Sequence, residues 1–197
     1  VDSGVDSNHP ALQNDESGIR EIISSDFSGS GTTDDTLVHG TYVAGVIASS
    51  DNTYKGISFG VDRLINAKHV GGVRSDTLAA LDWAILNPID GAEILSNSWG
   101  YGVFDCNEMQ NINYLFDGST ISWTKYMDAA IDYYDIASVV AAGNYGFCGA
   151  KSVTAPADAY NIIAVGNIND KNTINRDDDV IYHTSSIGPS YDGRKKP

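Results

Sequence analysis

Short apolar runs recur along the chain, separated by longer stretches rich in polar residues and glycine. Four of them are partly β-branched, and each is followed within a few residues by Gly: Leu64–Ala67, Glu93–Ser98, Ile136–Ala142 and Ile162–Val165. Brief apolar runs of this kind are typical of strands that are buried on both faces of a parallel sheet. The pattern therefore predicts at least four such strands.

Helical spacing of apolar residues appears in three other stretches. Residues 78–86 carry Leu and Ile on one face, after a predicted N-cap at Ser75–Thr77 and before a predicted stop at Asn87-Pro88. A second helix is predicted over Trp123–Tyr134. A third is predicted to open near His39, where small and apolar residues follow one another.

This alternation of strands and helices predicts an α/β fold with a mainly parallel central sheet flanked by helices. Val1 is interpreted as the last residue of a further strand. Two long polar stretches, Ser24–Val38 and Gly100–Ile121, are predicted to be surface loops. The acidic run Asp177–Asp179 is predicted to be a solvated turn rather than a calcium site. Ligands bind beyond the carboxyl ends of parallel strands, so residues that follow the apolar runs are the candidates for chemistry.

Composition narrows the classes of protein that fit. The chain has 197 residues, 42% of them apolar, and its 12 basic and 26 acidic residues give a formal charge of −14. This length is sufficient for one domain with a sizeable core. Nucleic acid and membrane are not expected as partners, because both need a basic patch or an apolar span that the sequence lacks.

Three segments place reactive side chains where strands end or helices begin. Asp2 directly follows Val1 on a predicted tight turn. His39 lies at the start of a helix of small residues, and Asn144 follows the apolar run that ends at Ala142. Each has an ordinary explanation by itself, as a turn former, a capping residue or a strand-ending Asn. Together they form the acid, base and oxyanion donor that acyl transfer through a Ser–His–Asp triad requires.

These segments, in this order, resemble the subtilisin-like serine peptidases, the subtilase family. Asp2-Ser3-Gly4 is similar to the catalytic Asp motif of the family. His39-Gly40-Thr41 with Val43-Ala44-Gly45 is similar to its His motif. Ser96–Gly100 resembles the strand that pairs with substrate, and Ala141–Asn144 resembles the oxyanion segment.

The resemblance implies a three-layer subtilisin-like fold and a serine endopeptidase that cleaves extended polypeptides. It implies that Asp2 orients the base, that His39 is the general base and that Asn144 donates to the oxyanion. Hydrolysis by this route needs no cofactor, although some relatives hold a structural calcium ion, and one is allowed for here. The short loop between Ala48 and Gly56 argues against one of the family's calcium sites.

Substrate-binding residues are implied in two places. The backbone at Ser98, Trp99 and Gly100 is expected to pair with an extended peptide, which would add as a strand. Ala142 and Gly143 are expected to form one wall of the pocket for the side chain that precedes the cleaved bond.

The family's nucleophile motif, Gly-Thr-Ser-x-Ala-x-Pro, does not occur in the sequence. Residues 1–197 are therefore expected to form a single incomplete catalytic domain, lacking the start of its first strand and the helix that carries the Ser. This piece alone is predicted to be inactive, and the missing C-terminal part of the domain is an expected partner. The first residues show no targeting segment, so either a cytosolic protein or a mature or trimmed piece is expected. The resemblance implies an extracellular or cell-surface location.

The sequence does not decide whether the two cysteines form a disulfide or remain free thiols. In the family, the strands that precede Cys106 and Cys148 are neighbours in the sheet, so a bridge between the two is possible. Two free thiols are the alternative. A bridge would close a loop of about 42 residues and stabilise the chain by roughly 4 kcal/mol. It would also support an extracellular setting.

Other functions remain as alternatives. Gly56–Gly60 matches the G-x-S-x-G nucleophile elbow with Ser58 as nucleophile, but the residues before it are polar rather than strand-like. A metal hydrolase would use Asp2 and His39 with Asp34 or Asp35, although no motif of paired His ligands accompanies them. A third alternative is a non-catalytic binding or scaffold domain that keeps the subtilase fold.

Overall fold

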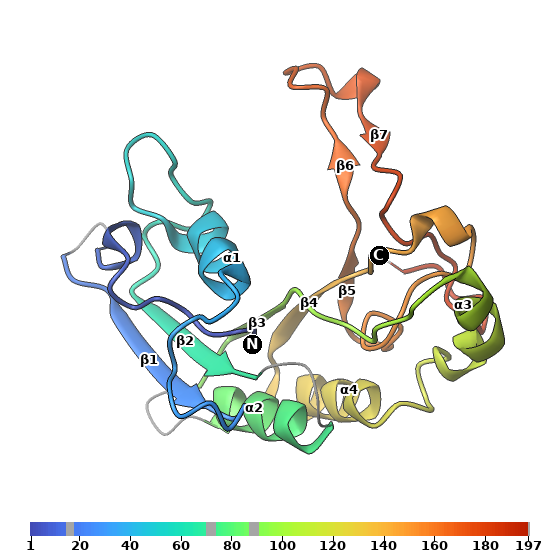
Figure 1. Ribbon diagram of the computed structural model, residues 1–197, viewed down its shortest axis with the longest axis horizontal. Helices are drawn as coiled ribbons and strands as arrows, with labels where there is room; N and C mark the ends of the chain where they lie inside the picture. Colours follow the sequence, from blue (N-terminus) through green and yellow to red (C-terminus); the bar gives the residue numbers. More distant parts are fainter. Residues whose placement is uncertain (15–17, 70–73, 87–90, 197) are drawn as a thin grey trace. The chain divides into compact units, whose positions relative to one another are not determined.

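The computed structural model describes residues 1–14, 18–69, 74–86 and 91–196 (Figure 1). The chain divides into two compact units, Val1–Ala92 and Glu93–Pro197, and each is described by itself. The expectation of one incomplete domain stays a prediction.

The first unit is built on two parallel strands. β1 (Glu21–Asp26) pairs with β2 (Arg63–Lys68) along its whole length, from Glu21 opposite Arg63 to Asp26 opposite Lys68. Asp2 adds an isolated parallel bridge to Lys68, so the start of the chain runs beside the end of β2. The remaining elements are helical: η1 (Pro10–Leu12), α1 (His39–Ala48) and α2 (Arg74–Leu86).

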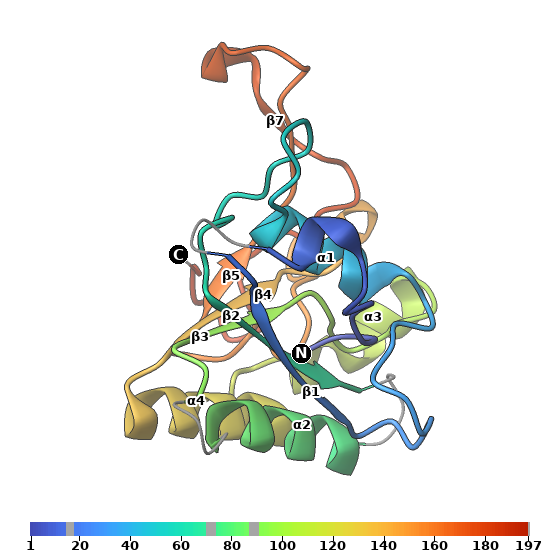
Figure 2. The same ribbon diagram turned by 90° about the vertical axis from the view of Figure 1, so that its left-hand side faces the viewer.

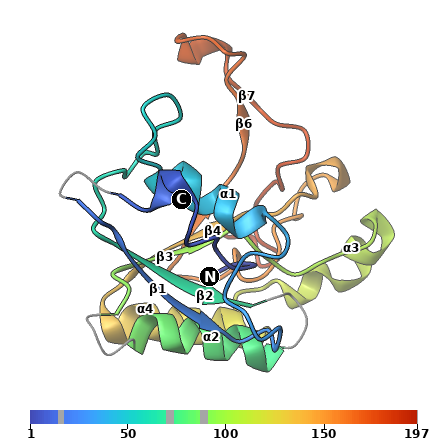
Figure 3. The same cartoon turned by 60° about the vertical axis from the view of Figure 1, so that its left-hand side comes forward.

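The two α-helices of this unit lie on opposite faces of the β1–β2 pair (Figures 2 and 3). On the α1 face, buried residues from the first segment, η1 and α1 pack against the strands: Val5, Leu12 and Ala44, with Ile22 and Leu64 beside them. On the α2 face, the rings of Phe27 and Trp83 lie 5.8 Å apart. The sheet therefore has apolar contacts on both faces, as the apolar runs predict.

The second unit is built on three parallel strands in the order β3 (Ile94–Asn97), β4 (Ala137–Ala141) and β5 (Ile163–Val165). α4 (Ser122–Tyr134) precedes β4 and packs against it. After β5, the chain forms an antiparallel hairpin of β6 (Ile168–Asn169) and β7 (Val180–Ile181), which extends away from α4 in Figure 1. The short helix η4 (Arg176–Asp178) lies in the hairpin loop.

A core cluster of this unit lies outside the strands. In the segment 106–115, α3 (Cys106–Ile112) contributes the buried Met109, and Ile112 and Leu115, at the ends of α3 and η2 (Asn113–Leu115), are partly buried against the same cluster. The buried members of the cluster are Val103, Met109, Phe116, Ile121 and Ala155. Phe116 is fully buried, and Tyr101 packs edge-on against its ring. This segment is therefore part of the core of the unit.

The structure confirms the α/β class, with mainly parallel strands and flanking helices. β2, β3, β4 and β5 occupy the four apolar runs, and α1, α2 and α4 occupy the three helical stretches.

Three predictions were wrong. β1 extends into the predicted loop Ser24–Val38, because backbone pairing to β2 continues through polar residues. Gly100–Ile121 is not a surface loop, because it contains α3 and a core cluster. Ser75 lies inside α2, which begins at Arg74, so it is not the N-cap. The predicted stop at Asn87-Pro88 lies outside the described residues.

Candidate active site

Asp2 and His39 are in direct contact in the first unit. The Nδ1 atom of His39 lies 2.7 Å from Oδ1 of Asp2. His39 is the first residue of α1, and Asp2 lies in the segment that bridges to the end of β2. The histidine side chain is 52% exposed and the aspartate side chain 13% exposed, so the carboxylate is shielded while the imidazole is accessible.

Two features hold this contact. The Oδ1 atom of Asp2 also accepts a hydrogen bond from the backbone N–H of Ser3, at 2.7 Å. Gly40 allows the helix to come this close, because a Cβ there would clash with the Gly4 carbonyl oxygen and lie 3.2 Å from Asp2. The other carboxylate oxygen, Oδ2 of Asp2, is buried and has no hydrogen-bond partner among the described residues.

The chemistry available to the pair follows from these contacts. A carboxylate at Nδ1 of His39 favours the tautomer with the proton on that nitrogen, which leaves Nε2 as the basic atom. The negative charge of Asp2 would also stabilise the imidazolium that forms when Nε2 takes a proton. The pair is therefore equipped for general acid–base catalysis.

In the second unit, the segment after β3 carries the predicted strand-pairing residues. The indole N–H of Trp99 donates to the side-chain oxygen of Asn97 at 3.1 Å, and its ring packs edge-on against Trp123. A Cβ at Gly100 would lie 3.2 Å from both the carbonyl oxygen of Ala155 and the hydroxyl of Thr154. The segment Ser98–Gly100 is thus held by the contacts of the Trp99 side chain and by the close approach of Ala155 and Thr154 to Gly100.

The segment after β4 carries the remaining predicted residues. Ala142 donates its N–H to Val165 on β5, at 2.9 Å. Gly143 has φ +114°, a conformation that L side chains rarely adopt, and a Cβ there would lie 2.7 Å from the hydroxyl of Ser186. The side chain of Asn144 is exposed, and no hydrogen bond to it is made by the described residues. Its amide is therefore available to an external acceptor.

Thr154 connects the two segments of the second unit. It is buried, and its N–H donates to the carbonyl oxygen of Ala142 at 3.4 Å. Its hydroxyl lies close to the positions that a Cβ would take at both Gly100 and Gly143. The structure thus brings Gly100, Ala142 and Gly143 around one buried threonine.

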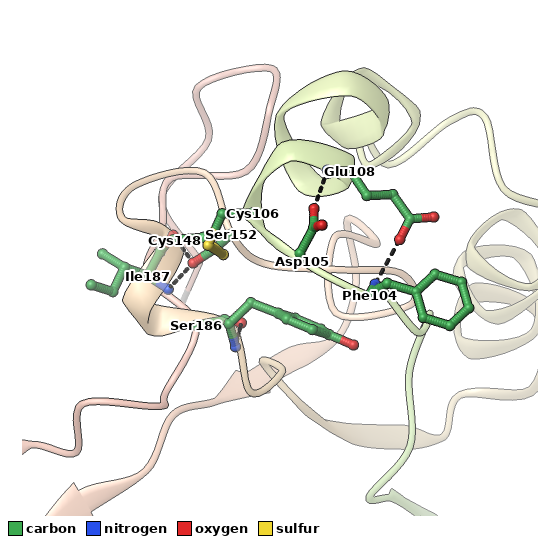
Figure 4. The surroundings of a disulfide bond; sticks show 9 residues. Phe104, Asp105, Cys106, Glu108, Cys148, Ser152, Ser186 and Ile187 are labelled. Carbon is green, nitrogen blue, oxygen red and sulfur yellow. Dashed lines mark hydrogen bonds between the residues drawn. A yellow bond between two sulfur atoms is a disulfide. The ribbon is translucent and has the colours of Figure 1, made fainter.

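A disulfide bond joins Cys106 and Cys148, with 5.2 Å between their Cα atoms (Figure 4). It resolves the alternatives for the two cysteines in favour of a bridge. Asp105 caps the bridged end of α3, and Glu108 accepts a hydrogen bond from the N–H of Phe104 (Figure 4). The bond connects the start of α3 to η3 (Gly146–Cys148), close after Asn144.

Buried titratable groups are present in both units. Burial lowers the pKa of His69, next to β2 in the first unit, to about 4. In the second unit, burial raises the pKa of Asp158, although its carboxylate accepts hydrogen bonds from Gly118 and Thr124. Neither group has a role in the predicted chemistry.

Asp35 is a residue of the site that the sequence analysis considered only as a metal ligand. Its carboxylate accepts hydrogen bonds from the Ser3 hydroxyl and from the N–H groups of Leu37 and Thr41. Burial alone would raise the pKa of Asp35, but these hydrogen bonds lower it below its usual value. Asp35 lies four residues before His39, whereas the cap position is occupied by Val38, so the usual capping signal does not identify it in the sequence.

The rival sites receive no support from the described part of the chain. Ser58 lies in an exposed turn after α1 and before β2, whereas a nucleophile elbow requires a strand before the Ser and a helix after it. Within residues 1–14, 18–69, 74–86 and 91–196, no three His, Cys, Asp or Glu side chains converge as they would to hold a metal ion. None of the described helices has the length and apolar character needed to cross a membrane.

The chain is similar to known proteins of one family. The profile of the subtilase family matches residues 1–197. Serine protease AprX of Bacillus subtilis (strain 168) is 30% identical over 172 residues, which cover 81% of this chain and 36% of that protein. Subtilisin of Bacillus pumilus is 30% identical over 178 residues, which cover 87% of this chain and 56% of that protein. The match thus spans between about a third and a little over half of these relatives.

Solved structures show the same fold. The prenylagaramide maturation protease PagA aligns with a TM-score of 0.64 and 22% identity, over 96% of this chain and 58% of that chain. The self-cleaved protease domain of PatA aligns with a TM-score of 0.67 and 21% identity, over 96% of this chain and 62% of that chain. The predicted subtilisin-like fold is therefore confirmed.

Proposed function

The chain belongs to the subtilase family, and from this membership we propose that it forms part of a serine endopeptidase acting on extended polypeptides. The observation that carries the proposal is the 2.7 Å contact between Nδ1 of His39 and Oδ1 of Asp2. An exposed imidazole oriented by a shielded carboxylate is the acid–base pair that a serine peptidase requires.

In the proposed mechanism, Nε2 of His39 takes the proton of a serine hydroxyl as the oxygen attacks the substrate carbonyl. The serine lies outside residues 1–197, since the family motif for it does not occur there. Asp2 keeps the imidazole in the reactive tautomer and stabilises the imidazolium. The imidazolium then gives the proton to the leaving amine, and water repeats the sequence on the acyl-enzyme.

Asn144 is proposed to donate its side-chain amide to the oxyanion of the tetrahedral intermediate. Its exposed amide, which has no partner among the described residues, supports this role. The positive φ of Gly143 fixes the direction in which the chain leaves β4 immediately before Asn144. A donor held in place before the reaction stabilises developing charge without a reorganisation cost.

The substrate is proposed to bind as an added strand along Ser98, Trp99 and Gly100. Such pairing uses main-chain hydrogen bonds and leaves side-chain selection to neighbouring pockets. Ala142 and Gly143 are proposed to line the pocket for the side chain before the cleaved bond. The same proposal includes a C-terminal part that completes the domain and an extracellular or cell-surface location. It also allows for a structural calcium ion. The disulfide supports the location, because such bonds persist in oxidising compartments.

The test compares residues 1–197 with the longer protein that carries them. A fluorophosphonate probe is expected to label the longer protein and to leave residues 1–197 unlabelled. In the longer protein, Asp2→Asn is expected to lower kcat for a peptide anilide by roughly 10⁴-fold, because the imidazole would favour the wrong tautomer. Asp6→Asn, on the same segment but without contact to His39, is the matched control and should retain activity.

Two results would overturn the proposal. One is labelling of a residue within 1–197, which would mean that the nucleophile lies in this chain. The other is full peptidase activity in both His39→Ala and Asp2→Asn. A longer protein that binds peptides without cleaving them would instead identify a non-catalytic scaffold.

A further inference from the structure

Two side chains hold the first turn of α1 from outside the helix. The carboxylate of Asp35 accepts a hydrogen bond from the N–H of Thr41 at 2.7 Å. The hydroxyl of Ser3 accepts from the N–H of Gly40 at 3.0 Å and donates to Asp35 at 2.8 Å. Asp35 therefore holds one helix N–H directly and a second through Ser3. The cap residue itself, Val38, makes no side-chain hydrogen bond to the helix.

The same two residues connect to the acid–base pair. His39 is the first residue of this turn, so the position of its imidazole depends on the helix start. Ser3 donates its backbone N–H to Oδ1 of Asp2, the oxygen that also contacts His39. Ser3 thus bonds to Asp2 through its backbone and to Asp35 through its side chain. A continuous set of hydrogen bonds runs from Asp35 to both members of the pair.

The loop that carries Asp35 is fixed to β2. The Nζ atom of Lys68 donates to the carbonyl oxygens of Thr32 and Asp34, at 3.0 and 2.7 Å. Asn66 donates to the carbonyl oxygen of Thr33 at 3.1 Å. Residues 66 and 68 lie on the same face of the strand, and both are buried. Three consecutive carbonyl groups before Asp35 are therefore anchored to the sheet.

We propose that Asp35 is a positioning residue for the Asp2–His39 pair, acting through Ser3 and the first turn of α1. This inference rests on the proposed function of the pair as the acid–base group. The role requires a carboxylate, because three donors approach its two oxygens: Ser3 and Leu37 at Oδ1, and Thr41 at Oδ2. An Asn side chain would offer one acceptor oxygen and would turn its NH₂ group toward at least one donor.

The alternative is that Asp35 only caps the helix. A cap contributes to stability, and its loss would leave the imidazole of His39 in the same tautomer. The two roles are therefore distinguished by the state of the ring and not by stability.

The experiment records the ring nitrogens of His39 by NMR, in residues 1–197 labelled with ¹⁵N-histidine, at about pH 8, where an ordinary histidine is neutral. Asp35→Asn is expected to lower the ratio of the Nδ1–H to the Nε2–H tautomer at least threefold. Asp34→Asn is the matched control, because it removes a neighbouring charge from a side chain that accepts no hydrogen bond from the described residues. Its tautomer ratio should equal that of the parent chain.

Ser3→Ala is the second variant, since it keeps the contacts of Asp35 to Thr41 and Leu37 but removes the link to Ser3. It should shift the tautomer ratio in the same direction by a smaller factor. A folded Asp35→Asn chain with an unchanged ratio would overturn the proposal. Loss of folding in Ser3→Ala would also overturn it, because the hydroxyl would then serve the whole unit. The readout needs no hydrolysis, so failure of the peptidase proposal would appear separately, in the fluorophosphonate test.

Discussion

His39 and Asn144 each follow a residue with positive φ, but the residue differs between the two units. In the first unit it is Val38, with φ 67°, and in the second it is Gly143, with φ 114°. A β-branched residue is strained in this region, whereas glycine enters it without a steric cost. Both segments thus use a residue with positive φ, but only the second uses a residue type that adopts it without strain.

The surroundings of the two segments differ accordingly. Directly after Val38, the N–H groups of Gly40 and Thr41 in the first turn of α1 donate hydrogen bonds to Ser3 and Asp35. Around Asn144, Ser186 bonds to both neighbours: its N–H donates to the Gly143 carbonyl oxygen at 3.0 Å, and its hydroxyl accepts from the N–H of Tyr145 at 3.1 Å. The disulfide at Cys148 adds a covalent link to this segment. We infer that a carboxylate and its hydrogen bonds hold the acid–base pair, while neutral hydrogen bonds to Ser186 and a disulfide hold the segment of the predicted oxyanion donor.

The largest effect is expected from removing the disulfide of the second unit. Replacing both Cys106 and Cys148 by Ser should destabilise the second unit by about 4 kcal/mol, because the bond closes a loop with a sequence separation of 42. Native-state hydrogen exchange of the β3–β4–β5 amides would measure the loss. The NMR signals of His39 should stay unchanged. A loss below about 1 kcal/mol would mean that packing of α3, and not the bond, fixes this region.

The next largest effect compares two glycines with similar φ. A Cβ at Gly4, with φ +111°, would lie 2.7 and 2.8 Å from the backbone oxygens of Asp34 and Thr33. At Gly143 the close neighbours are the hydroxyls of Ser186 and Thr154, which can move. Gly4→Ala should therefore cost about 3 kcal/mol and Gly143→Ala roughly half of that, measured by urea unfolding. Equal losses would show that φ alone sets the cost.

Much of the fold was predictable because the signals were strong. The apolar runs at β2, β3, β4 and β5 and the helical stretches at α1, α2 and α4 follow from periodicity alone. β1 was missed because Ser24, Ser25 and Asp26 are polar, and only the partner strand reveals them as paired residues. α3 was missed because it is too short for helical periodicity to separate it from a loop.

The candidate site was predictable to a different degree. Asp2, His39 and Asn144 were chosen as candidates because reactive residue types stood next to predicted element ends, in segments that resemble the subtilase motifs. The structure brings Asp2 and His39 into contact. The role of Asp35 was missed because it acts four residues before the helix start, outside the usual cap position, which Val38 occupies. No pattern in the sequence connects Asp35 to Ser3, since that contact depends on the loop being anchored by Lys68.

A smaller effect concerns pH and belongs to the first unit. Burial lowers the pKa of His69 to about 4, below its ordinary value near 6.5, so the folded state keeps this ring neutral. As the pH falls below 6.5, the unfolded chain binds the proton more readily, and stability is lost until the pH reaches the folded pKa. Between about pH 7 and pH 5 this amounts to about 2 kcal/mol.

His69→Gln tests this effect, because it removes the titrating group from a buried position next to β2. The variant should lose about 2 kcal/mol less than the parent chain over the same pH range, measured by urea unfolding at each pH. His183→Gln is the control, since His183 is exposed and should leave the pH dependence unchanged. An equal loss in the parent chain and in His69→Gln would assign the acid sensitivity to other groups.

The smallest expected effect comes from replacing the positive-φ valine before His39 by glycine, the residue type that precedes Asn144. Val38→Gly would give His39 the same kind of neighbour that Asn144 has. Relief of a left-handed β-branched residue is worth about 1–2 kcal/mol, and the entropy that glycine adds to the unfolded chain takes back somewhat less than 1 kcal/mol. A net gain of about 1 kcal/mol in urea unfolding is therefore expected. Leu37→Gly is the control. Leu37 has no positive φ, so this variant should be less stable than the parent chain.

If Val38→Gly is destabilising instead, the valine side chain contributes packing that outweighs its strain. If the tautomer ratio of His39 falls while stability rises, the strained valine itself helps to orient the base.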